Sequence, residues 1–177
     1  MCGFCDASLS VSCDHRPCRR RTRLNPEPLP DQGTDLATSI VGVWGLSSRE
    51  DYDTQGNRLI DPHLGADPIG MLAFSNNHFT AQFSKRDRSN LSAAVAVQTA
   101  NNSSAVGGYD AYFGSYWVDE TGEAIIVALE GSITAANTGQ EFTRVTRASD
   151  HQLLIRLETS TDDGTPITRT LTFERLP

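Results

Sequence analysis

Short apolar runs separated by turn residues recur along most of this chain. From residue 39 onward, β-branched, aromatic or alternating runs end repeatedly in clusters of Gly, Asn, Asp or Pro. This rhythm is typical of strands joined by turns and differs from the 3.6-residue period of helices. The runs span residues 41–50, 69–75, 78–83, 113–118, 124–130, 141–148, 152–158 and 165–175. We therefore predict an all-β domain of about eight antiparallel strands.

The turns between these runs indicate hairpins. Asn76 and Asn77 form a two-residue connection of the kind that closes a tight hairpin. Further turns are expected at residues 119–123, 149–151 and 161–164. A sheet of this size usually closes, since closure removes exposed strand edges, and a barrel of about eight strands can hold one small ligand. The prediction is a closed antiparallel barrel with a small-molecule cavity.

One internal segment is too long to be a hairpin turn. Residues 84–108 are rich in Ala, Ser and Asn. Loops of this length in compact domains serve as lids or are mobile, and both alternatives stay open. A short helix between Leu91 and Tyr109 is the one helix that the sequence suggests.

Residues 1–37 differ from the rest and are predicted to form a disordered Cys-, Arg- and Pro-rich tail and linker before a barrel at residues 38–177. The first 23 residues hold five arginines and two aspartates, a balance of +3, which leaves −10 for the rest out of the total of −7. All four cysteines lie in the first 18 residues, spaced C-x2-C-x7-C-x4-C. The middle spacing is shorter than zinc fingers use. We favour a disordered leader, or an extension from a start codon placed too far upstream, over a folded zinc site.

Charge and composition exclude several classes of protein. An acidic body lacks the basic surface that nucleic-acid binding needs. No stretch approaches the roughly 18 apolar residues of a membrane helix, and the N-terminus lacks the apolar core of a secretory signal, so the expected location is the cytoplasm. The chain has no P-loop, dinucleotide fingerprint or G-x-S-x-G, and the barrel has no cysteine and no His/Asp/Glu cluster with metal-ligand spacing. We therefore predict neither a cofactor nor a metal.

Several stretches together resemble a known family. The G-x-W of Gly42 and Trp44 is similar to that of lipocalins, and the body resembles the bacterial and fungal lipocalin-like domain family more closely. The matching stretches, in order, are residues 40–44, 67–72, 80–83, 111–120, 129–132 and 171–175. One departure is that members often carry histidines just before the Glu-Gly-Ser element, where this chain has Val127 and Ala128. No role of those histidines transfers to this chain.

The resemblance implies a closed barrel that encloses a small molecule, in a setting of specialised metabolism. Related barrels include carriers and also cyclases and isomerases, and the fold alone does not choose between them. The leading hypothesis is a cofactor-independent isomerase, cyclase or dehydratase acting on a hydrophobic metabolite. The alternative is a non-catalytic binding or carrier protein that uses the same cavity.

The G-x-W tryptophan is expected to be structural. By resemblance to lipocalins, Trp44 should plug one end of the barrel, covered by Arg175 from the last strand. A cation–π contact of this kind contributes about 0.5–2 kcal/mol, depending on burial.

Three residues are the catalytic candidates: Glu130, Arg144 and His78. Glu130 ends an apolar run and Arg144 lies in the next one, so adjacent strands could place the two side by side. The pair is then either a structural ion pair or an acid–base carboxyl tuned by burial and by the arginine. His78 opens its run after a turn and is expected either at the surface or in the pocket as a proton carrier.

The substrate-binding candidates are Tyr112, Tyr116, Gln82 and Met71. Tyr112 and Tyr116 are four residues apart in one run, so both side chains are expected on the same, inward face of the strand. Gln82 and His78 are also four residues apart, so they are expected on one face of their strand. The aromatic residues of the same run that point outward are expected to pack either on the lid or on a partner subunit. In the second case the protein would be a homodimer.

Overall fold

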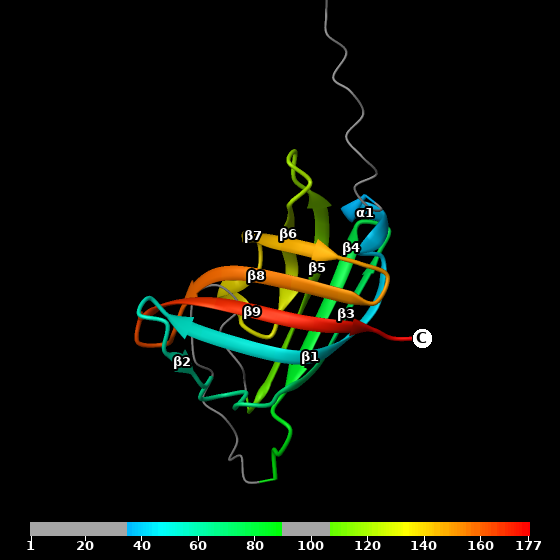
Figure 1. Ribbon diagram of the computed structural model, residues 1–177. Coiled ribbons are helices and arrows are strands. Elements are labelled where there is room, and N and C mark those ends of the chain that lie inside the picture. The colour runs from blue at the N-terminus through cyan, green and yellow to red at the C-terminus, as the bar shows by residue number, and fades with distance from the viewer. Residues whose placement is uncertain (1–34, 90–106) are drawn as a thin grey trace, which may run out of the picture. The chain divides into compact units, whose positions relative to one another are not determined.

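The protein is described by a computed structural model that covers residues 35–89 and 107–177 (Figure 1). The strands are β1 (Gly42–Asp53), β2 (Arg58–Leu59), β3 (Ile69–Ser75), β4 (His78–Ser84), β5 (Tyr109–Val118), β6 (Ala124–Ser132), β7 (Glu141–Ala148), β8 (Gln152–Ser160) and β9 (Pro166–Arg175). A four-residue helix, α1 (Leu36–Ser39), precedes β1, and a 3-10 turn, η1 (Ala135–Asn137), follows β6.

The strands form one closed antiparallel barrel. Neighbours in the sheet follow the order β2-β1-β3-β4-β5-β6-β7-β8-β9, and β1 also pairs with β9. The first half of β1 pairs with β3, while the β9 pairing runs from Trp44 opposite Arg175 to Asp53 opposite Ile167. Figure 1 shows β1 in cyan beside β9 in red. The predicted fold is confirmed, because eight strands close the barrel. The two-residue strand β2 is additional and pairs with the end of β1.

The hairpin turns follow the sequence signals. Asn76 and Asn77 have φ angles of 49° and 62°, the left-handed values that a two-residue type I′ turn requires at both positions. The turns after β5, β7 and β8 also lie where they were predicted.

Two features of the strands were not predicted. Strand β5 begins at Tyr109 rather than at residue 113, because polar Asp110 interrupts the apolar pattern that marks the run. Strand β2 has only two residues, too few to show any alternation. The segments predicted as a tail as far as residue 34, and as a lid or short helix over residues 90–106, lie outside the described residues.

One end of the barrel is plugged by Trp44, as predicted. The indole is fully buried and its Nε1 donates a hydrogen bond of 2.9 Å to the carbonyl of Ile40. The Arg175 guanidinium lies 4.0 Å from the centre of the ring and donates to the carbonyls of Ser39, Val41 and Asp150. A Cβ at position 42 would lie 2.3 Å from Arg175 Nη1, and φ there is +140°, so the G-x-W glycine gives the arginine its space.

Candidate functional site

The barrel interior contains a cavity with an apolar part and a polar part. It offers about 50 Å³ to the centres of water molecules, and the space between the lining side chains is larger than this, because each centre has a water radius of clearance around it. The apolar lining comes from five strands, β3, β4, β6, β8 and β9: Leu72, Phe74, Phe79, Phe83, Ile125, Val127, Ile155, Leu157, Leu171 and Phe173. The polar lining consists of Arg49, Asp110, Tyr112, Arg144 and Arg169.

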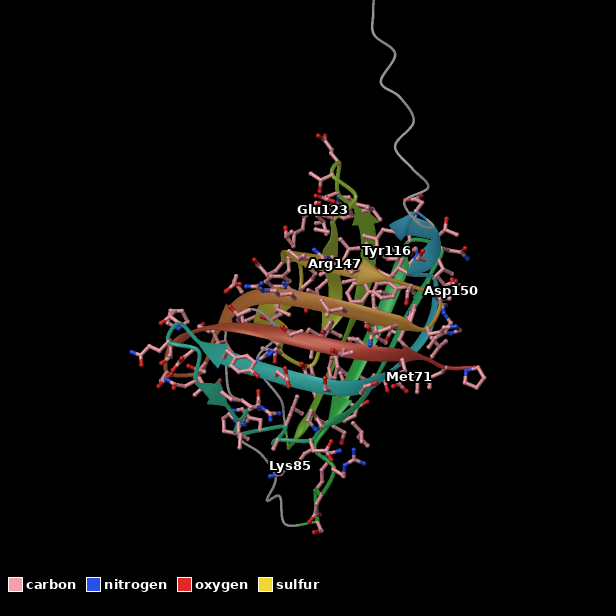
Figure 2. The ribbon with its side chains drawn as sticks, viewed as in Figure 1. Met71, Lys85, Tyr116, Glu123, Arg147 and Asp150 are labelled. Carbon is pink, nitrogen blue, oxygen red and sulfur yellow. The ribbon has the colours of Figure 1, made fainter. Side chains whose placement is uncertain are left out.

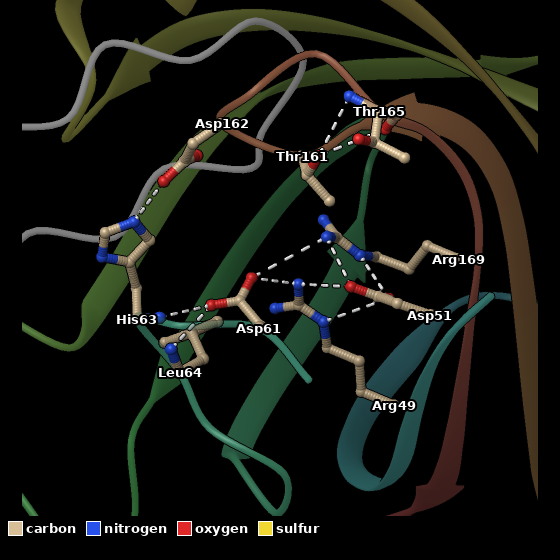
Figure 3. Close-up of polar contacts among 9 residues, drawn as sticks. All are labelled: Arg49, Asp51, Asp61, His63, Leu64, Thr161, Asp162, Thr165 and Arg169. Carbon is tan, nitrogen blue, oxygen red and sulfur yellow. Dashed lines mark hydrogen bonds and ion pairs between the residues drawn. The ribbon is translucent and has the colours of Figure 1, made fainter. Parts of the chain in front are cut away.

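A buried ion-pair network stands at the polar end, away from Trp44 (Figure 3). Arg169 donates two hydrogen bonds of 2.8 Å to the two oxygens of Asp51. Arg49 bridges Asp51, at 3.0 Å, and Asp61. Burial would raise the pKa of Asp51, but the hydrogen bonds and charge of Arg169, together with Arg49, hold that pKa below its ordinary value. The network therefore keeps two arginines charged in the barrel wall.

The same network fixes the loop between β2 and β3. Asp61 Oδ1 accepts backbone hydrogen bonds of 2.8 Å from His63 and from Leu64, whose side chain is buried in the core. His63 Nε2 lies 2.6 Å from Asp162 Oδ2 in the β8–β9 turn (Figure 3). The loop is thus attached to the barrel through both the network and the turn.

Asp110, near the start of β5, is the titratable group that stands out in the cavity. Its side chain is buried, with the residue 4% exposed, and it lines the cavity opposite Phe83 on β4. None of the salt bridges among the described residues includes Asp110. Burial raises the pKa of its carboxyl to about 7, against the opposing charges of Arg49 and Arg169. Near neutral pH both its acid and its base form are populated.

Tyr112 interacts electrostatically with Asp110 and with Arg144, which also line the cavity. Burial, reinforced by the charge of Asp110, raises the pKa of the Tyr112 hydroxyl to about 12, so the phenol stays protonated. Burial and the charge of Arg169 lower the pKa of Arg144 to about 10, so it remains a cation at neutral pH. Arg144 Nη1 donates to the Thr143 carbonyl at 3.1 Å, and its guanidinium lies 4.9 Å from the centre of the Phe142 ring. A carboxyl, a phenol and a guanidinium thus face one enclosed space.

The structure separates the catalytic candidates taken from sequence. Arg144 is buried in the cavity wall and pairs across the strands with Ile125. Glu130 is exposed at the far end of β6, so the two are not side by side. His78 is exposed, and its Nδ1 lies 2.9 Å from the carbonyl of Asn76. The catalytic roles assigned to Glu130 and His78 stay predictions.

The predicted binding residues also divide between the two faces of the sheet, and Figure 2 labels two of them, Tyr116 and Met71. Tyr112 lines the cavity, and Tyr116 is buried in the core with its ring edge-on to Phe74 at 4.8 Å. Gln82 is exposed and accepts a hydrogen bond of 3.0 Å from the Tyr109 hydroxyl, and Met71 is 50% exposed on the outer face. Both tyrosines lie on the inward face of β5, and the binding roles of all four residues stay predictions.

Three cavity residues were missed in the sequence: Asp110, Arg169 and Arg49. Asp110 shares the inward alternation of Tyr112, and Arg169 occupies an inward position between Ile167 and Leu171. A charged residue in an inward position of a strand is unusual, because the other inward positions are apolar. This signal could have identified both Asp110 and Arg169 as cavity residues. Arg49 offered no such signal, because a register shift in β1 reverses the alternation between Trp44 and Arg49.

Fold and cavity together define a closed barrel of the kind that encloses a small ligand. A family model described as a lipocalin-like domain matches residues 41–176, and the chain belongs to that family. The resemblance inferred from the sequence is therefore confirmed. No curated protein matches the chain. In the described ranges, no helix has the length and apolar character to cross a membrane.

Proposed function

We propose that this chain binds a hydrophobic small molecule in the barrel cavity and converts it by acid–base chemistry with its own side chains. The reaction class is an isomerisation, a cyclisation or a dehydration. The family supports small-molecule binding, since the barrel encloses a cavity lined mostly by apolar side chains. The setting in specialised metabolism, the cytoplasmic location and the homodimer expected from the sequence stay predictions.

The observation that carries catalysis is the buried carboxyl of Asp110. A general acid or base works best when its pKa lies near the working pH, because it can then both accept and return a proton. Burial brings Asp110 to that range in a cavity shielded from water. In its acid form the group can deliver a proton to one carbon or oxygen of a substrate, and the resulting carboxylate can then remove a proton from another.

Two neighbouring residues would stabilise the charge that develops on the substrate. Tyr112 offers a neutral hydroxyl donor, and Arg144 offers a fixed cation. Donors aimed at a developing oxyanion act strongly in an apolar cavity, since little water competes with them. Binding would align the substrate through its contact with the phenylalanine side of the cavity.

The test is a turnover experiment in heavy water that does not require the substrate to be known. Protein at low concentration is incubated in D2O with a small-molecule extract of the source cells. Products are then followed by mass spectrometry. Proton transfer at carbon should give a product with carbon-bound deuterium, or one that has lost water. Asp110→Asn should fold normally and form that product about 10²-fold or more slowly.

Parallel variants distinguish the competing assignments. Glu130→Gln and His78→Gln test the candidates taken from sequence. A loss of turnover in either, with Asp110→Asn fully active, would transfer the acid–base role away from Asp110. Wild type and Asp110→Asn could instead both bind one extract compound stoichiometrically and form no product. That result would contradict catalysis and support the carrier alternative.

A further inference from the structure

More cations than carboxylates line the cavity. Arg49 and Arg169 are matched by Asp51 and Asp61, to which the ion pairs of the network join them. The cavity lining adds one further cation, Arg144, and one further carboxyl, Asp110. When Asp110 is ionised these six charges cancel, and when it is protonated they leave one positive charge. The cavity is thus suited to accept one negative charge.

The polar lining residues lie together, and the apolar lining continues beyond them. Tyr112 interacts electrostatically with Asp110, Arg144, Arg169 and Arg49, and Asp110 interacts with Arg49 and Arg169. The apolar part extends from them toward the Trp44 end, where Phe74 packs on Phe79 and on Tyr116. A ligand that fills both parts has one charged or polar group and one apolar body.

We propose, on the basis of the proposed function, that the ligand is a small organic acid that binds as its anion. Its carboxylate would lie among Arg144, Tyr112 and Asp110, and its hydrocarbon part would lie against the phenylalanine side of the cavity. A guanidinium presents parallel N–H donors that match the two oxygens of a carboxylate, and such charge-assisted hydrogen bonds are among the stronger ones in proteins. The cavity therefore selects acids over neutral molecules of the same shape.

The potential at Arg144 also favours an anion. Arg144 is only 7% exposed. Its burial and the nearby charge of Arg169 both disfavour the charged form of its guanidinium. A bound carboxylate would offset both effects. A cationic ligand would add a third positive charge beside Arg144 and Arg169, and we expect it to be rejected.

Binding of an anion should be linked to a proton on Asp110. Two carboxylates that share one site cannot both ionise readily, so the bound anion requires the acid form of Asp110. Among the described residues, the charged and titratable groups that line the cavity with Asp110 or act on its charge are Arg49 on β1, Asp61 in the β2–β3 loop, Tyr112 on β5, Arg144 on β7 and Arg169 on β9. The neighbouring strands β4, β6 and β8 contribute Phe83, Ile125, Val127, Ile155 and Leu157, which do not titrate. Asp110 is thus the group expected to take up the proton near neutral pH.

The experiment compares benzoate with benzamide, which have the same shape and differ in charge. Binding to the full chain is measured by NMR shift titration at pH 6 and pH 8. We expect benzoate to bind more tightly than benzamide at pH 6 and to lose about tenfold in affinity by pH 8, as Asp110 ionises. Benzamide affinity should not change with pH.

Two variants separate the roles in the site. Asp110→Asn is always neutral, so it should bind benzoate at pH 8 about as tightly as wild type does at pH 6. This is a gain of affinity that unfolding cannot mimic. Arg144→Met should weaken benzoate about tenfold or more while leaving benzamide unchanged.

The outcomes distinguish this inference from the proposed function. Equal, pH-independent binding of both probes would overturn the selection of anions while leaving the cavity as a binding site. A pH dependence of benzoate binding that persists in Asp110→Asn would overturn the proton linkage. Binding of neither probe would contradict the cavity as a ligand site, and with it the proposed function.

Discussion

Asp51→Ala should lower the free energy of unfolding by about 3–5 kcal/mol, the usual cost of breaking a buried ion pair by removing one partner. Asp51 accepts hydrogen bonds from both Arg49 and Arg169, and all three side chains are buried. Without it, Asp61 alone would balance two buried cations. The measurement is urea unfolding followed by circular dichroism.

The matched control for this variant is Asp67→Ala. Asp67 also pairs with an arginine, Arg86, at 2.8 Å, but the two side chains are 73% and 61% exposed. Exposed pairs contribute about 0–1 kcal/mol, so this variant should unfold almost as wild type does. Equal losses in the two variants would contradict the importance of burial in the network.

The effect of Asp51 should also depend on pH. Its pKa in the folded protein lies below the ordinary value, so its contribution is fully present above the unfolded-state pKa of about 3.9 and is lost as the pH falls through the lower, folded-state pKa. The difference in stability between wild type and Asp51→Ala should therefore shrink below about pH 4. A difference that stays constant down to pH 2 would contradict this account.

Trp44→Ala should also cost about 3–5 kcal/mol, as the removal of a large aromatic side chain from a packed core does. The variant loses the plug of the barrel, the hydrogen bond to Ile40 and the ring beneath the Arg175 guanidinium. The chain supplies its own comparison in Trp117, which is 42% exposed on the outer face. Trp117→Ala should cost far less in the same urea titration. A nearly neutral Trp44→Ala would show that the indole is not a structural anchor.

A strand such as β9 could be predicted because its residues alternate strictly. In β9 the inward residues Ile167, Leu171 and Phe173 alternate with outward threonines, so both the strand and its buried face follow from the sequence. The type I′ turn at Asn76 and Asn77 could be predicted because few residues tolerate positive φ. Local chemistry determines both features.

The polar part of the cavity was harder to predict, because strand irregularities reverse the alternation. The register of β1 against β9 shifts between Leu46 and Ser48, so Trp44 and Arg49 both face inward although they differ in parity. The β5–β6 register shifts as well, between Phe113 and Gly114, where a Cβ on the glycine would lie 1.9 Å from the Ala128 carbonyl oxygen. Such bulges depend on pairing between distant strands, which a single sequence does not reveal.

The catalytic candidates from sequence depended on neighbours in the chain rather than in space. Glu130 follows an apolar run, but it lies beyond the stretch of β6 that pairs with β7, where its carboxylate is exposed. Asp110 precedes the recognised run of β5, and only barrel closure surrounds it with the arginines of β1, β7 and β9. Closure thus places the titratable group inside.

A titration of the Asp110 carboxyl carbon by NMR tests the central claim most directly, with Asp110→Asn used to assign the resonance. We expect a midpoint at about pH 7 in the protein without ligand. The midpoint should rise when benzoate is added, because the anion binds to the protonated form. A midpoint near 4, the ordinary value for an aspartate in water, would contradict both the acid–base role of Asp110 and the linked binding of an anion.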